Sequence, residues 1–199
     1  MSRRFPLLRR VTAPAVAPVT LAEAKSWLRY DDDDQDGLIE GLVAGAVDWL
    51  DGWRGALGRC LINQEWSYVL GRWPESGELA FPFPDVSSVT VEAILDGANA
   101  LTAVPDATLG LPVWDGRLSR VPLAPSPPAL SDKPGAVRVR FVAGFGPNPS
   151  DVPASLREAI LIKVADAFRF RESAGQGVGA IGVAGSLDAL LLPYQTIVS

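Results

Sequence analysis

The sequence predicts an α+β fold, because helical and strand-like apolar periodicities occupy separate parts of the chain. Over residues 35–53 the apolar side chains recur at spacings of three and four, which indicates one apolar stripe along a helix. Residues 61–70 and 137–142 instead alternate in the manner of half-buried strands. Proline and glycine divide the stretch between them into short pieces, as turns between strands do. We therefore expect a small bundle of three main helices with an inserted set of short antiparallel strands.

The composition argues against several classes of protein. The 199 residues are 48% apolar, which is enough for the core of one ordinary domain. A balance of 18 basic against 23 acidic side chains gives a net charge of −5, which does not favour a protein that grips a phosphate backbone. The chain has no histidine, the commonest general base and imidazole metal ligand, and its single cysteine, Cys60, has no disulfide partner. No segment approaches the roughly 20 apolar residues of a membrane span. An enzyme and a membrane partner are therefore disfavoured.

Three helices are expected. Thr20 and Glu23 have the spacing of a capping box, which predicts a helix over residues 20–29. The long apolar stripe predicts a second helix over 35–54, ended by glycines, and Ser150 or Asp151 is the expected N-cap of a third over 152–172. The apolar sides of the second and third helices carry Leu38, Ile39, Leu42, Val43, Ala46, Val47, Trp49, Leu50, Trp53, Leu156, Ala159, Ile160, Lys163, Val164, Ala167 and Phe168.

Strand-like segments fill most of the region between the second and third helices. They occupy residues 61–70, 78–81, 88–95, 100–104, 116–121 and 136–143. The third and fourth flank Asp96, Gly97, Ala98 and Asn99, which have the composition of a hairpin turn. The proline-rich residues 122–134 cannot form a paired strand and are expected to be an extended loop.

The chain is expected to have three parts. Residues 1–18 form an extended, flexible N-terminal arm, and residues 19–174 form a single domain with its strand-rich insert at about 61–143. Residues 175–199 form a glycine-rich tether and an apolar C-terminal peptide. An isolated helix as short as this peptide is not stable in water, so we expect a hydrophobic groove to cover it, either on a partner or on its own domain. The candidate partner-binding residues are Leu187, Leu190, Leu191, Pro193 and Tyr194.

The acidic run before the second helix matches only half of a calcium loop. Asp32, Asp34, Asp36 and Gly37 take loop positions one, three, five and six, but Val43 stands where the bidentate glutamate belongs. We expect these carboxylates instead to cap the N–H groups of the following helix and to complement its dipole.

A second motif lacks its structural context. Gly177, Gly179 and Gly182 spell G-x-G-x-x-G, yet they follow a helix rather than joining a strand to a helix. We therefore predict no nucleotide site. No catalytic, cofactor or metal residue is predicted elsewhere in the chain.

The order of several segments carries a family resemblance. They are residues 18–28 (PVTLAEAKSWL), the acidic run leading into Leu38 and Ile39, and residues 61–66 (LINQEW), 141–146 (FVAGFG), 152–160 (VPASLREAI) and 190–194 (LLLPY). In this order the chain resembles the head-tail connector (adaptor) proteins of long-tailed phages and of phage-derived gene transfer agents. The resemblance covers most of the chain from residue 18 onward. The N-terminal arm and the loop at 122–134 match nothing in the family pattern.

The resemblance implies a structural virion protein rather than an enzyme. Such a connector forms a homo-oligomeric ring of about twelve copies beneath the portal protein, with heterologous contacts between neighbours. It joins the DNA-filled head to the next neck protein, a stopper or head-completion protein, or to a tail terminator. DNA passes through its channel without sequence-specific binding. It is assembled in the bacterial cytoplasm and resides in the neck of the virion or gene-transfer-agent particle. The C-terminal peptide is the segment that we expect to dock on the portal.

Two other function classes stay open. A carboxylate- or metal-dependent hydrolase would have to use the acidic residues 31–36. A single-stranded nucleic-acid-binding module could stack bases on Trp66, Tyr68 or Trp73, although it should also carry a basic groove.

Overall fold

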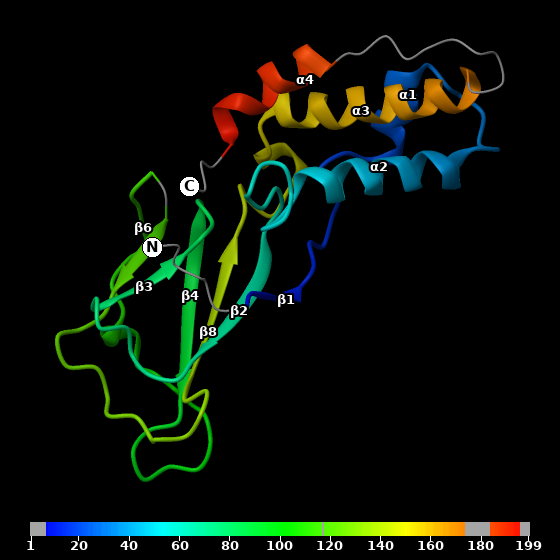
Figure 1. Ribbon diagram of the computed structural model, residues 1–199. Helices are drawn as coiled ribbons and strands as arrows, with labels where there is room; N and C mark the ends of the chain where they lie inside the picture. The colour runs from blue at the N-terminus through cyan, green and yellow to red at the C-terminus, as the bar shows by residue number, and fades with distance from the viewer. Residues whose placement is uncertain (1–6, 117, 174–183, 196–199) are drawn as a thin grey trace. The chain divides into compact units, whose positions relative to one another are not determined.

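The computed structural model describes residues 7–116, 118–173 and 184–195 (Figure 1). These residues contain helices and antiparallel sheets, which confirms the predicted α+β class. They fall into two compact units, described separately below. The strand unit comprises residues up to Pro14 together with Asn63–Gly144, and the helical unit comprises Ala15–Ile62 and Phe145 onward. No helix within the described residues is long and apolar enough to cross a membrane.

Helix α1 (Leu21–Leu28) begins at the predicted capping box. The Glu23 N–H donates to Thr20 Oγ1 at 3.2 Å, and the Thr20 N–H donates to Glu23 Oε2 at 2.8 Å. The helix ends at Arg29, whose φ of 55° lies in the left-handed region. Both ends of α1 are therefore set by local sequence.

Helix α2 (Asp36–Leu50) buries Ile39, Val43, Ala46 and Leu50 along one side. It ends at Leu50 instead of continuing to residue 54. Gly52 follows with a φ of 81°, so it is this glycine, and not a later one, that turns the chain.

Trp49 was wrongly assigned to the buried side of α2. It is 38% exposed, and the Lys163 ammonium lies 4.1 Å from the centre of its ring. The stripe predicted from periodicity was thus wider than the face that the helix buries.

Helix α3 (Ala154–Ser173) buries Leu156, Ala159, Ile160, Val164 and Phe168. Its predicted N-cap, Ser150 or Asp151, is wrong because these residues belong to a separate 3₁₀ turn, Pro149–Asp151. The Asp151 carboxylate accepts from the Asn148 N–H at 2.8 Å and closes that turn. Ala167, predicted to be on the buried side, is exposed.

The core of the helical unit lies among its helices, whose ribbons are shown in Figure 1. Its buried members are Val19, Ala24, Ile39, Val43, Ala46, Leu50, Leu57, Leu61, Ile62, Val152, Leu156, Ala159, Ile160, Val164, Phe168 and Leu191. Three predicted helices contribute to this core, together with one residue of a fourth, α4 (Ala184–Leu191).

The strand unit contains a five-stranded and a three-stranded sheet, both antiparallel throughout. The first has the order β1-β2-β8-β4-β5 and the second the order β3-β7-β6. The strands are β1 (Arg9–Thr12), β2 (Gln64–Leu70), β3 (Glu78–Phe81), β4 (Val86–Ala93), β5 (Thr102–Ala103), β6 (Val113–Trp114), β7 (Ser119–Pro122) and β8 (Val137–Ala143).

An aromatic cluster joins the two sheets. The ring of Phe81 on β3 lies 4.8 Å from that of Phe141 on β8 in a T-shaped arrangement, and Tyr68 on β2 contacts both. Strand β8 buries alternate residues and leaves Arg138 and Arg140 half-exposed, which confirms its predicted alternation.

The predicted hairpin is also present. Ala93 of β4 pairs with Thr102 of β5, and Gly97 in the connecting turn has a φ of 74°. Of the predicted proline-rich loop, Pro122 ends β7, and Leu123 and Leu130 make only isolated bridges.

Two strands were not predicted. All four residues of β1 are exposed, and β6 has two residues, both exposed. Neither strand buries an alternating set of side chains, so neither leaves a period in the sequence. The pairing of β1 with β2 also corrects the expected arm: part of it is an edge strand of the five-stranded sheet.

Candidate functional site

The C-terminal segment of the helical unit, residues 184–195, holds the predicted partner-binding residues. It forms α4 and a 3₁₀ turn, Leu192–Tyr194, and α4 lies along α3 (Figure 1). Leu191 is 1% exposed, while Leu187, Leu190 and Tyr194 are partly buried against the helical core. The segment is therefore packed on its own unit, which was one of the two arrangements that the sequence left open. Most of the glycine-rich stretch before it, including Gly177, Gly179 and Gly182, lies outside the described residues.

Aromatic contacts hold the end of this segment. The ring of Tyr194 meets that of Phe145 edge-on with centroids 6.2 Å apart, and the Ser155 hydroxyl donates to the Tyr194 hydroxyl at 3.4 Å. The Arg59 guanidinium lies over the Phe145 ring at 4.7 Å and lies 6.0 Å from the centre of the Tyr194 ring. Aromatic and cation–π contacts of this kind each contribute about 1 kcal/mol.

The predicted set divides into a packed part and an exposed part. Pro193 is exposed, and Leu192, which was not predicted, is 71% exposed. The sequence could have identified Leu192 as exposed, because this residue falls outside the spacing that places the packed residues on one side. Leu192 and Pro193 therefore present apolar surface to solvent beside side chains that are already covered.

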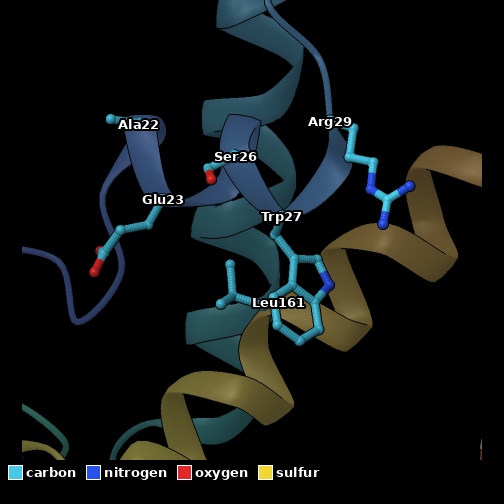
Figure 2. A pocket seen from close by; sticks show the side chains of 6 residues that line it. All are labelled: Ala22, Glu23, Ser26, Trp27, Arg29 and Leu161. Carbon is cyan, nitrogen blue, oxygen red and sulfur yellow. The ribbon is translucent and has the colours of Figure 1, made fainter.

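A second surface of the helical unit is a shallow groove of about 670 Å³ between α1 and α3 (Figure 2). Leu161 and Trp27 lie beside each other in its lining, and Trp27 is 46% exposed. Arg29 extends along one side, and the rest of the lining comes from Ala22, Glu23 and Ser26. An indole left this open on a helix is apolar surface that a partner can cover. Sequence reasoning missed the groove, because its walls are far apart in the chain.

An ion pair supports one wall of the groove. Arg157 of α3 pairs with the Glu23 carboxylate, and its Nε donates to the Pro18 carbonyl at 3.1 Å. The hydrogen bond from the Thr20 backbone, followed by contributions from the Thr20 hydroxyl and Arg157, holds the pKa of Glu23 below its usual range against the opposing effect of burial. The start of α1 is thereby tied to α3.

The acidic run does not cap α2 as predicted, although Asp36 lies in the first turn of that helix, where a carboxylate complements its dipole. The N-cap of α2 is Gln35, which makes no side-chain capping bond. Instead the Lys25 ammonium donates to Asp33 at 2.6 Å and to Asp36 at 2.7 Å, and the Tyr30 hydroxyl donates to Asp34. The hydrogen bonds to these carboxylates raise the pKa of Lys25, and the bond with Lys25 lowers the pKa of Asp33. The carboxylates thus hold the turn between α1 and α2.

The described residues offer no cation site of the usual kind. In the parts of the chain that the structure describes, no group of three or more His, Cys, Asp or Glu side chains is placed to hold a metal ion. The hydrolase hypothesis therefore gains no support from the acidic run.

The aromatic residues proposed for base stacking pack within the strand unit. Tyr68 is 3% exposed and its burial raises the pKa of its phenol, while the Trp66 ring lies 5.2 Å from that of Phe83. Trp73 is half-buried, and its indole N–H donates to the Pro128 carbonyl at 2.8 Å. A base cannot stack on a ring that is buried in the protein, so Tyr68 is not available for stacking.

Comparison with known proteins gives structural likeness without sequence relatives. No protein-family model matches the sequence, and no curated protein shows a significant match. A chain in the neck of an empty gene transfer agent (GTA) particle, computed with C6 symmetry, has a TM-score of 0.75 and 21% identity, with 96% of each chain covered.

Two other solved structures agree. A chain in the virion of a native gene transfer agent particle has a TM-score of 0.72 and 23% identity, and one in the neck of a native GTA particle computed with C12 symmetry has 0.66 and 21%. Both matches also cover 96% of each chain. The protein therefore has the fold of these chains over nearly its whole length.

Proposed function

We propose that the protein is a structural component of a phage-like particle, a head-tail connector that forms a ring in the neck. The observation that carries this proposal is the shared fold over 96% of both chains with proteins of gene transfer agent necks. That likeness includes both the strand-rich and the helical parts, so it does not rest on a common small motif. The segments that resemble the connector family in the sequence support the same assignment.

A cyclic ring of about twelve copies requires two different surfaces that meet around the axis. The groove beside Trp27 is a candidate for one of them, since a neighbouring copy would cover its exposed indole and pair with Arg29. The net charge of −5 suits a wall along which DNA passes without being held, because basic side chains would bind its phosphates. The other partners that we propose are the portal protein and the next neck protein or tail terminator.

The C-terminal segment is the part that we propose docks on the portal. Leu187, Leu190, Leu191 and Tyr194 pack on the helical unit in the free chain, so docking through them requires the segment to leave α3. Leu192 and Pro193 are already exposed and supply the first contact. The same apolar residues would contact α3 in the free chain and the portal in the particle. Docking therefore requires that they bind the portal groove more favourably than they pack on α3.

The proposal is tested by assembly with the portal protein of the same particle. Electron microscopy of the coexpressed proteins should show a ring of this chain on the portal, and particles lacking the chain should contain filled heads without tails. A chain that stays monomeric beside the portal and is missing from purified particles would refute the connector assignment.

The docking role needs a separate variant. Truncation after residue 185 should leave a folded protein that no longer binds the portal, with the full chain as the control. Normal assembly of the truncated chain, or its general unfolding, would count against docking of this segment on the portal. Neither result would bear on the proposed ring.

A further inference from the structure

The N-terminal strand β1 is attached to the strand unit almost entirely through its backbone. It pairs antiparallel with β2, placing Arg9 opposite Ser67, Arg10 opposite Trp66 and Thr12 opposite Glu65. Its four side chains are all exposed, and a side-chain hydrogen bond from the Thr12 hydroxyl to Glu65 at 3.0 Å supports the pairing. No side chain of β1 enters the core. The strand therefore recognises an edge of β2 rather than a pocket shaped for its own side chains.

The segment after β1 is built to stay extended. Residues 13–18 read A-P-A-V-A-P, and each proline restrains both its own backbone and that of the residue before it. All of these residues except Pro14 and Pro18 are exposed. The far end is fixed, because Pro18 and Val19 are buried and Arg157 binds the Pro18 carbonyl. A proline-rich segment anchored at one end behaves as a semi-rigid spacer.

Exchange of β1 between copies would keep the contacts that pair β1 with β2. Every backbone hydrogen bond that β1 makes to its own β2 can be made identically to the β2 of another copy, and no buried side chain has to be withdrawn. In a cyclic ring each copy gives one strand and receives one, so the exchange closes and leaves no edge of β2 uncovered. Neighbours in a ring also meet at high effective concentration.

We propose that in the assembled ring β1 of each copy pairs with β2 of the neighbouring copy, so that the N-terminal arms link the ring. This inference rests on the proposed ring and identifies a contact that holds it together. The partner is a second copy of this chain, recognised by strand addition to the edge of β2 that β1 covers in the single chain.

Cysteines at directly opposed positions test the exchange. In a Cys60→Ala background, protein carrying Arg9→Cys is mixed with protein carrying Ser67→Cys and assembled with the portal. A short bis-maleimide is used beside mild oxidation, so that the result does not depend on disulfide geometry. Exchange predicts a crosslinked dimer on a denaturing gel, and the double variant should give a ladder of higher multimers. Leu111→Cys mixed with Ser67→Cys is the control for chance encounters, because Leu111 is 84% exposed and lies outside both strands.

The outcomes separate this inference from the proposed function. In one outcome rings form, but crosslinks appear only in the double variant and only within single chains. This result would overturn the exchange and leave the connector assignment intact. Crosslinks from Arg9→Cys to the portal instead of to a second copy would also overturn it. If neither rings nor crosslinked dimers form, both proposals fail. As a second measurement, removal of residues 1–12 should abolish or weaken the ring while the single chain keeps a cooperative melting curve; an equally stable ring would refute the exchange.

Discussion

Leu191→Ala measures how firmly the C-terminal segment is docked on the free protein. Leu191 is 1% exposed, so its side chain is worth about 1.5–3 kcal/mol of burial, and leucine-to-alanine changes in cores cost about 2–5 kcal/mol once the cavity is included. The segment is short, and its release would also melt α4, an 8-residue helix that is not stable alone. The measured loss is therefore limited to the free energy of docking.

Hydrogen exchange followed by mass spectrometry is the suitable assay, because it reports local opening of residues 184–194. A loss of about 2 kcal/mol would lower their protection roughly 30-fold, since each 1.4 kcal/mol is a factor of ten. A urea titration should also show destabilisation of the whole protein if the segment opens with the core.

Leu192→Ala provides a matched control at the adjacent position. Leu192 is 71% exposed, so the same chemical change should alter stability by less than about 0.5 kcal/mol. Equal protection of the segment in the two variants would show that it is not docked as described, and the reasoning about its release onto the portal would then lose its starting point.

Three further outcomes are expected. Val164→Asp places a carboxylate at a site that is 1% exposed and should cost several kcal/mol in a urea titration, whereas Ala167→Asp on the exposed side of the same helix should cost little; similar midpoints would contradict the assignment of the core. The pKa of Glu23 is lowered by folding, so its contribution is present above about pH 4, the range of the unfolded carboxyl, and is lost as pH falls through the folded pKa. Glu23→Gln should therefore flatten the acid side of the stability curve, and an unchanged slope between pH 5 and about 2 would count against this network. Millimolar calcium should leave the melting temperature unchanged, because the acidic run is bonded to Lys25 and Tyr30; a rise of several degrees would show a site that binds the native state.

The sequence by itself determined the elements whose signals are local. Both hydrogen bonds of the predicted capping box between Thr20 and Glu23 are present in the structure, because the two residues belong to one helical turn. The buried side of α2 and the alternation of β8 follow from periodicity, since a residue's face depends on its position along its own element. The hairpin turn at Gly97 was likewise encoded by adjacent residues.

The tertiary structure decided the features that depend on what lies opposite a residue. Strand β1 left no pattern because its pairing uses the backbone, which is the same for every sequence. The acidic run was assigned to the wrong partners because α1 turns Lys25 toward Asp33 and Asp36, a geometry that composition does not encode.

The two candidate surfaces of the helical unit show the same division. Apolar spacing identified Leu191 as a residue that must be covered, but only the packing of α4 on α3 shows that the chain covers it by itself. The groove at Trp27 needs Leu161, which is distant in sequence and comes from another helix. Periodicity shows which side of an element is to be buried. Which other element packs against that side is determined by packing over the whole unit.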